Sequence, residues 1–344
     1  MPLKRSSLIY FCILLLALFV SGTPLYSQST QTFSTEPNPL QISEMRRAVY
    51  PGSGITIEST VVAGLYYNQY VASYQSDGNK IDALMSVPVG EKPAHGWPII
   101  VFNHGYIAPS EYRTTERYVR YVESLTLAGY IVFKPDYRGH GSSEGEPASG
   151  GGYGDPGYTI DTLNAVAALK AYPDADPNRI GMWGHSMGGQ ITLRAMTVSK
   201  DIRAGVIWAG VVSPYPDIIA RWHRIHSRVQ LSREGKSWAD SFNSWYEAAS
   251  QRYGTIEENP AFWASVSPNA YLSEISGQVQ LHHARGDPVV PLAWSEILAG
   301  EFKEMRIPYE FYIYENDDHN ISNNFAVAMR RTIEFFDSHV KYAP

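Results

Sequence analysis

Cysteine is almost absent from this chain of 344 residues, and the single one, Cys12, lies in an apolar run near the N-terminus. One thiol can neither close an intramolecular disulfide nor supply the paired cysteines of a structural zinc site. Cys12 also lacks the sequence context of a lipid-attachment motif. We therefore expect a fold stabilised by its hydrophobic core, for which 44% of hydrophobic residues in a chain of this length are ample.

Clustered positive charge is missing as well. The chain has 28 Lys and Arg against 34 Asp and Glu, which gives a net charge of −6, and no stretch of it is strongly basic. Binding to nucleic acid needs Lys and Arg gathered along the phosphate path. The composition therefore argues against a nucleic-acid partner.

Phosphate-binding and metal-binding motifs are incomplete. The glycine-rich residues 135–145 lack the Lys-Ser/Thr of a P-loop and the helix start of a dinucleotide site. Within them we expect Asp136 and Arg138 to form an ion pair that holds neighbouring loops together. Residues 174–178 begin like a calcium loop, but Arg179 stands where its sixth position needs Gly and His185 where its twelfth needs Glu. We expect neither a metal nor a cofactor.

Residues 1–27 have the plan of a secretory signal peptide. Two basic residues precede an apolar run over residues 8–20, and small or polar residues follow. The run is shorter than the about 20 residues that span a bilayer. We expect cleavage near Ser27, with a cut nearer residues 21–22 and an uncleaved anchor as alternatives. The mature protein would then be secreted or periplasmic, without membrane contact beyond this segment.

The rest of the chain divides into two parts. Residues 28–80 combine a Ser-, Thr- and Pro-rich leader with β-branched stretches that predict antiparallel strands. Residues 81–344 form the main domain, in which short apolar runs alternate with helix-like segments. The runs cover residues 98–103, 130–134, 179–183, 204–208, 279–284 and 309–314. Such alternation predicts right-handed crossovers and an α/β fold with a doubly wound, mostly parallel sheet.

Two segments between these strands need separate mention. Tyr118, Tyr121 and Leu125 recur at helical spacing, which predicts a helix over residues 111–128 that Ser110 opens and Gly129 closes. Residues 213–268 are too long for one crossover and rich in aromatic side chains. We expect a mostly helical insertion there, lying either over the site as a roof or beside it on the sheet.

The strongest motif is G-x-S-x-G around Ser186. It follows an apolar run that ends at Trp183 and precedes a helix-like segment. A serine on such a tight strand-to-helix turn has strained backbone, and its neighbours must lack bulk where strand and helix close together. The helix N-terminus also offers unpaired N–H groups beneath it. We predict that Ser186 is a nucleophile.

A serine nucleophile needs a base and an acid, and both are expected later in the chain. Asp287 follows one predicted strand and His319 follows the next, so both lie at the sheet edge that carries Ser186. His319 is favoured as the base over His282 and His283, which lie within a strand, and over His339 in the C-terminal helix. Asp287 is favoured as the acid over Asp317 and Asp318, which are too close in sequence to His319.

Acyl transfer also needs donors for the developing oxyanion. We predict the backbone N–H of Met187, directly after the nucleophile, and the backbone N–H of Tyr106, after the first parallel strand. Gly105 would let the chain turn inward there, and the Tyr106 hydroxyl is either a further donor or packed.

Together these motifs resemble a known family. Five segments carry the resemblance: residues 103–105, 136–141, 184–189, 286–291 and 318–319. The chain resembles the catalytic domain of the prolyl oligopeptidase family, which includes dipeptidyl and acylaminoacyl peptidases, and related single-domain esterases of the α/β-hydrolase superfamily. The resemblance implies the α/β-hydrolase fold and a Ser-Asp-His triad.

The activity implied is that of a secreted serine hydrolase that cleaves a peptide or acyl-amino bond through an acyl-enzyme. Two departures keep alternatives open. The residues before the domain are too few for the β-propeller of the large peptidases, and Tyr106-Ile107-Ala108 replaces a fuller glycine run. A carboxylesterase acting on acylated sugars, aromatic or lipid esters is the alternative, and a non-catalytic binding module the minor one. The expected partner is a small ester or peptide substrate, and the oligomeric state is not predicted.

Overall fold

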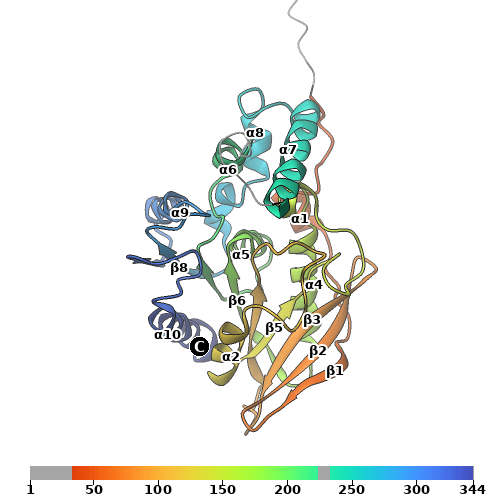
Figure 1. The fold of residues 1–344 in the computed structure, drawn as a ribbon, viewed down its shortest axis with the longest axis vertical. Helices are drawn as coiled ribbons and strands as arrows, with labels where there is room; N and C mark the ends of the chain where they lie inside the picture. The colour runs from red at the N-terminus through yellow and green to blue at the C-terminus, as the bar shows by residue number, and fades with distance from the viewer. Residues whose placement is uncertain (1–32, 224–232, 344) are drawn as a thin grey trace, which may run out of the picture. The chain divides into compact units, whose positions relative to one another are not determined.

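The computed structural model describes residues 33–223 and 233–343 (Figure 1). The predicted signal peptide lies outside these described residues. Within them, none of the helices has the combination of length and apolar character that a bilayer span requires.

Nine strands of the described part form a single sheet (Figure 1). In spatial order it runs β1-β2-β3-β5-β4-β6-β7-β8-β9, with antiparallel pairing from β1 through β3 to β5 and parallel pairing for the rest. The predicted doubly wound, mostly parallel α/β fold is therefore confirmed. The strands are β1 Thr56–Ala63, β2 Tyr67–Ser76, β3 Asn79–Pro88, β4 Trp97–Asn103, β5 Ile131–Pro135, β6 Ala175–His185, β7 Ala204–Trp208, β8 Gln278–Ala284 and β9 Tyr309–Tyr314.

Helices cover both faces of the sheet, as the alternation along its central strands requires. In β4, Ile99 and Val101 join the core beneath α1, α4, α5 and α9, whereas Ile100 and Phe102 join the core beneath α2 and α10. Successive side chains of a strand point to opposite faces, so a fully apolar strand must be buried on both. The helices are α1 Ile42–Arg47, α2 Val119–Leu127, α3 Ser149–Gly152, α4 Gly157–Lys170, α5 Met187–Val198, α6 Tyr215–Trp222, α7 Arg233–Tyr253, α8 Pro260–Ser265, α9 Leu292–Glu304 and α10 Phe325–Phe336.

The helix predicted over residues 111–128 is half as long as expected. Helix α2 begins at Val119, because Arg117 and Tyr118 adopt left-handed backbone angles, with φ of 58° and 53°. Before them the chain turns inward, and the fully buried Tyr112 donates a hydrogen bond to Asp136. Ser110 therefore opens no helix. Gly129 closes α2 as predicted, with φ of 89°.

The predicted ion pair between Asp136 and Arg138 is wrong. Asp136 instead accepts hydrogen bonds from Tyr112 and Thr114. Arg138 pairs with the fully buried Asp161, whose Oδ1 lies 2.7 Å from Arg138 Nη2. Asp161 belongs to α4, so this pair ties the glycine-rich loop to the helix rather than to itself. Asp161 lies within an apolar helical stretch of the sequence, and nothing in that stretch predicted its ion pair with Arg138.

Residues 213–268 contain α6, α7 and α8, which lie together above α5 in Figure 1. Their aromatic side chains share one buried cluster with Met187 and Ile191 of α5. The Trp238 indole N–H donates to the Gly151 carbonyl, which anchors α7 on the segment before α4. Among the described residues of the insertion, 213–223 and 233–268, none lines the pocket beside Ser186.

Buried histidines make the stability of this fold dependent on pH. Burial lowers the pKa of His185 to about 3 and holds the pKa of His104 and His282 well below the ordinary value. Below about pH 6.5 the unfolded chain binds protons at these three histidines that the folded protein does not bind, so their contribution to stability falls as the pH falls. Each of these histidines then lowers the free energy of unfolding by up to about 1.4 kcal/mol for every unit by which the pH falls.

We accordingly expect a lower denaturation midpoint in urea at pH 5 than at pH 7. His282→Gln should make this loss smaller, whereas His95→Gln, at an exposed position, should leave it unchanged. Equal midpoints at the two pH values would contradict the prediction.

Candidate active site

Ser186 occupies a strained turn between β6 and α5. Its backbone has φ of 56° and ψ of −119°, a region that residues with a side chain rarely adopt. Its N–H donates to the Trp208 carbonyl at 3.0 Å, and its carbonyl accepts from Gly189 and Val211 at 2.9 and 3.1 Å. These bonds to β7 and the segment after it hold the strained conformation in place. Strain maintained in this way is typical of functional positions.

The flanking glycines are required by close backbone contacts. A Cβ at Gly184 would lie 2.2 Å from the Gly188 carbonyl oxygen, and one at Gly188 would lie 2.0 Å from the Asn103 carbonyl oxygen. Any side chain at either position would force strand and helix apart. The G-x-S-x-G pattern is thus explained by the space available on both sides of Ser186.

His319 and Asp287 come together across 32 residues of sequence. His319 Nδ1 lies 2.7 Å from Asp287 Oδ2, and the other oxygen, Oδ1, accepts the N–H groups of Val289 and Val290 at 2.8 and 3.0 Å. The Asp287 side chain is fully buried. Burial alone would raise its pKa, but the hydrogen bonds from His283 and His319 outweigh that cost and hold the pKa well below its ordinary value. Asp287 is therefore ionised at neutral pH.

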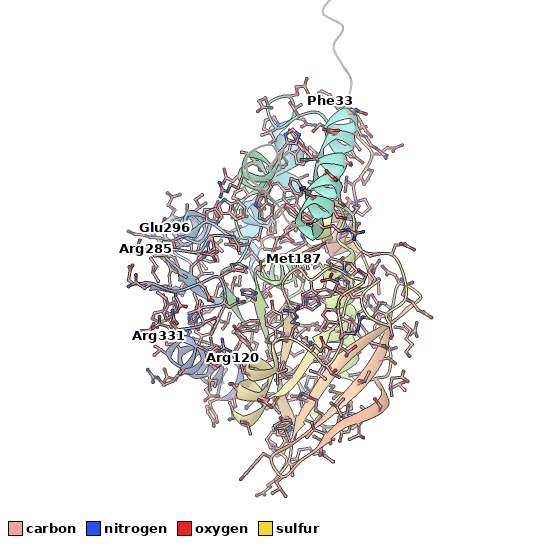
Figure 2. The ribbon with its side chains drawn as sticks, in the orientation of Figure 1. Phe33, Arg120, Met187, Arg285, Glu296 and Arg331 are labelled. Atoms are coloured by element: carbon pink, nitrogen blue, oxygen red, sulfur yellow. The ribbon has the colours of Figure 1, made fainter. Side chains whose placement is uncertain are left out.

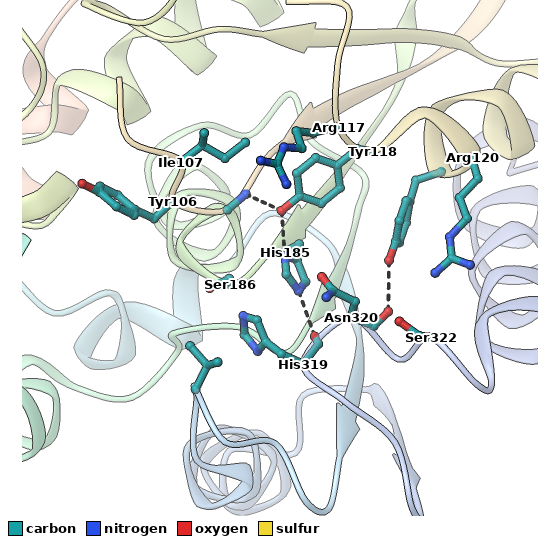
Figure 3. A pocket seen from close by; sticks show the side chains of 13 residues that line it. Tyr106, Ile107, Arg117, Tyr118, Arg120, His185, Ser186, His319, Asn320 and Ser322 are labelled. Carbon is teal, nitrogen blue, oxygen red and sulfur yellow. Dashed lines mark hydrogen bonds between the residues drawn. The ribbon is translucent and has the colours of Figure 1, made fainter. Parts of the chain in front are cut away.

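Ser186 and His319 line the same pocket and approach each other in Figure 3. No hydrogen bond joins the Ser186 hydroxyl to the His319 ring in this conformation. Serine–histidine pairs commonly tighten only once substrate is bound. The structure thus brings the three predicted residues to one edge of the sheet, after β6, β8 and β9.

A relay of hydrogen bonds, which sequence analysis missed, ties His319 to the loop after β4. His185 Nε2 donates to the His319 carbonyl at 2.9 Å, which leaves Nδ1 as the acceptor of the Tyr118 hydroxyl at 2.8 Å. The Tyr118 oxygen in turn accepts the Gly105 N–H at 3.0 Å, as the dashed lines of Figure 3 show. Burial keeps His185 neutral, so this donor order persists across the usual pH range.

The two predicted oxyanion donors belong to the helix that Ser186 precedes and to the loop after β4. Met187 is the first residue of α5 and lies at the centre of the molecule in Figure 2. Tyr106 follows Gly105, where an added Cβ would lie 3.1 Å from the Ser186 Cβ. The loop therefore approaches the serine closely. The Tyr106 ring extends away from Ser186 in Figure 3, so its hydroxyl does not face the reacting position.

The competing residues have other contacts. His283 is fully buried and accepts from Ser295 at Nδ1, and its Nε2 faces both the Val290 carbonyl and Asp287. His282 contacts Tyr314 and Gln280. The Asp317 carboxylate accepts backbone N–H groups of its own loop, including those of residues 323 and 324. In the described part of the chain, no three His, Cys, Asp or Glu side chains are grouped so that they could hold a metal ion.

The pocket beside Ser186 has a volume of about 470 Å³. It is formed by the loop after β4, the start of α2, the turn at Ser186 and the loops after β8 and β9. Its lining residues are Gly105, Tyr106, Ile107, Arg117, Tyr118, Arg120, Tyr121, His185, Ser186, Val289, His319, Asn320 and Ser322.

A family model described as the alpha/beta hydrolase family matches residues 94–337, which is more than half of the chain. The chain belongs to the alpha/beta hydrolase family. The predicted α/β-hydrolase fold and superfamily are thereby confirmed.

This hydrolase is similar to both peptidases and esterases. The uncharacterized peptidase YtmA of Bacillus subtilis (strain 168) is 24% identical over 254 residues, which cover 73% of this chain and 85% of YtmA. Six other curated relatives are matched over only 21% to 52% of their own length.

Solved structures of peptidases and of esterases are likewise similar to this chain in fold. Dipeptidyl peptidase 4 of Porphyromonas gingivalis has a TM-score of 0.59 at 20% identity, over 80% of this chain and 36% of the peptidase. The acetyl xylan esterase from Paenibacillus sp. R4 has a TM-score of 0.60 at 18% identity, over 86% of this chain and 92% of the esterase. The hydrolase thus spans about a third of the peptidase and nearly all of the esterase.

The relay through Tyr118 leads to a prediction about the activity of the hydrolase. Tyr118→Phe keeps the ring but removes the oxygen that joins Gly105 to His185. The loop that carries Tyr106 would then lose its fixed position, and we expect kcat on an activated ester to fall about tenfold, the cost of about one lost charge-neutral hydrogen bond. Substrate binding should change little.

The control for this variant is Tyr67→Phe, which removes a hydroxyl bonded to Glu123 away from the pocket. It should leave kcat unchanged. A Tyr118→Phe enzyme with wild-type kcat would show that the relay does not position the loop.

Proposed function

We propose that this protein is a serine hydrolase that works through an acyl-enzyme. Ser186 attacks a carbonyl carbon while His319 takes the proton from its hydroxyl, and His319 later delivers this proton to the leaving group. Asp287 holds the His319 ring in the tautomer that leaves Nε2 free to act as base, and offsets the charge of the imidazolium. The observation that carries the proposal is the His319–Asp287 contact of 2.7 Å in the pocket of the strained Ser186.

The N–H groups of Met187 and Tyr106 would bind the oxyanion that forms in this attack. Both belong to backbone held from two sides, by α5 and by the Tyr118 relay. Donors that are already in position require no reorganisation when the charge develops, which is why such contacts contribute strongly to catalysis.

For the substrate, we propose a carboxylic ester. The described lining of the pocket contains no Asp or Glu, so no carboxylate there can form an ion pair with the free amino group of a peptide. Ester cleavage also depends less on protonation of the leaving group than amide cleavage does. The second candidate is a peptide or acyl-amino bond, which the similarity to YtmA over most of both chains supports.

The test compares a p-nitrophenyl ester with an aminoacyl p-nitroanilide at matched acyl groups. Cleavage of the ester alone is expected, and clear cleavage of the anilide would favour the peptidase. A fluorophosphonate probe should label the protein at Ser186. Absence of both turnover and labelling would instead indicate a non-catalytic binding module.

We also infer export, on the basis of the basic and apolar segments within residues 1–27. Cell fractionation should place the protein outside the cytoplasm, and N-terminal sequencing of the mature form should begin near residue 28. An intact N-terminus in the membrane fraction would favour an uncleaved anchor.

A further inference from the structure

The charge of the pocket is opposite to that of the whole chain. The chain carries a net charge of −6, yet the pocket lining includes two arginines, Arg117 and Arg120, and no carboxylate. Asp318 precedes His319 but is not part of the lining, and its Oδ1 accepts the N–H groups of Asn320 and Ser322. The end of the pocket formed by α2 is thus a local region of positive charge.

Neither arginine is neutralised. Within residues 33–223 and 233–343, no Asp or Glu oxygen lies within ion-pair distance of either guanidinium, whereas Arg138, Arg252 and Arg285 each have such a partner. Both Arg117 and Arg120 are exposed to solvent. A cation at the wall of a pocket that pairs with no carboxylate is available to an anionic ligand.

The backbone and the neighbouring rings direct these two side chains. Arg117 has a left-handed φ of 58°, an unfavourable conformation for a residue with a side chain, and Figure 3 shows its guanidinium beside the Tyr118 ring. Arg120 stacks over Phe325 with its guanidinium carbon 3.9 Å from the ring centroid. Stacking uses the face of the guanidinium, and its N–H edge, which also contacts the Tyr121 side chain, still has donors for a planar anion.

The start of α2 adds to the same field. This helix of nine residues has no acidic residue in its first turn and no side chain that caps its N-terminus. Its positive dipole end therefore remains uncompensated beside the two arginines, a favourable setting for an anion.

We propose that Arg117 and Arg120 bind an anionic group of the substrate, a carboxylate or a phosphate, while Ser186 attacks its ester carbonyl. The inference rests on the proposed ester hydrolysis and narrows its substrate to anionic esters. The two arginines bind and orient the substrate and take no part in the proton transfers.

The experiment measures kcat/KM for three pairs of neutral and anionic esters. Butyrate against glutarate monoester of p-nitrophenol places a carboxylate on the acyl side. Phenyl butyrate against 4-carboxyphenyl butyrate places it on the leaving group, and the 4-phosphonophenyl ester replaces carboxylate by phosphonate. The kcat/KM of each variant is divided by the kcat/KM of the wild-type enzyme on the same ester. This ratio removes differences in the intrinsic reactivity of the esters.

The double variant Arg117→Gln/Arg120→Gln should lower kcat/KM for at least one anionic ester about tenfold or more, mainly through KM, as expected for loss of a charge-assisted contact. Its neutral counterpart should change less than about twofold. Arg330→Gln, at an exposed arginine of α10, is the control and should change kcat/KM for neither the anionic nor the neutral esters. Sodium chloride at about 0.5 M should weaken the preference of the wild-type enzyme but not that of the double variant.

Equal losses on neutral and anionic esters, or no loss on either, would overturn the anion site and leave ester hydrolysis intact. Calorimetric binding of the anionic esters to Ser186→Ala gives a readout that needs no turnover. Affinity reduced about tenfold when both arginines are replaced supports the inference, and unchanged affinity rejects it, even if the protein cleaves none of the esters.

Discussion

Replacing Ser186 by alanine is expected to lower kcat for an activated ester by about 10⁴ or more, since the loss of a triad member removes the covalent route altogether. KM should change far less, because the pocket walls stay in place. Labelling by a fluorophosphonate should disappear with the activity. Stopped assays with purified protein, corrected for spontaneous hydrolysis, provide the measurement.

The fold should survive this change. Alanine matches serine in shape up to Cβ, and the bonds that hold the turn come from backbone groups of residues 186, 189, 208 and 211. An unchanged melting temperature would confirm this. Ser142→Ala is a suitable control, because Ser142 is exposed in the glycine-rich loop away from the pocket. A Ser186→Ala enzyme with more than about a hundredth of the wild-type rate would require another nucleophile.

The main features of the fold could be read from the sequence because they depend on local periodicity. Runs such as residues 98–102 and 204–208 contain no polar side chain, which a strand buried on both faces explains at that length. Once those strands are parallel, their carboxyl ends lie at one edge. That reasoning placed Ser186, Asp287 and His319 near one another without any knowledge of distances.

The errors arose where one residue decides the backbone. Tyr121 and Leu125 of α2 do face the same core, and Tyr118, just before the helix, packs against it. The periodicity could not reveal that Arg117 and Tyr118 adopt positive φ and start the helix late, because the local spacing is the same in both cases. Left-handed residues other than glycine are held by tertiary contacts, and these are not encoded in the neighbouring sequence.

Partnerships between distant residues were equally hidden. Arg138 has Asp77, 61 residues away, and Asp161, 23 residues away, as partners, and sequence analysis chose the nearest carboxylate instead. Tyr118 and His185 are separated by 67 residues, yet they link Gly105, in the loop after β4, to the carbonyl of His319. The G-x-S-x-G motif predicted the role of Ser186 but assigned none to the histidine before it.

Asp287→Asn is the second large effect that we expect, a fall in kcat of about 10²–10⁴. The structure shows why an amide cannot replace the carboxylate. Oδ1 accepts the N–H groups of Val289 and Val290, so the asparagine oxygen would occupy this place and its NH₂ the other. That NH₂ would face His319 Nδ1 and His283 Nε2, which are both donors towards Oδ2 in the wild-type protein.

Two donors cannot bond to each other, so the His319 ring must change tautomer. With Nδ1 unprotonated as the acceptor of the amide, Nε2 carries the proton and can no longer take one from Ser186. The variant should therefore fold and bind ester normally, yet acylate slowly. Pre-steady-state release of p-nitrophenol measures the acylation step, and the downfield N–H resonance of His319 in the proton NMR spectrum should vanish in parallel.

Asp318→Asn is the matched control. Its carboxylate precedes His319 in sequence but accepts only N–H groups of its own loop, a role that an amide oxygen can fill. We expect kcat within about threefold of wild type for this variant. If instead Asp287→Asn retained more than about a tenth of the wild-type rate while Asp318→Asn lost it, the acid would have to be reassigned. The buried contact of 2.7 Å between Asp287 and His319 would then be structural.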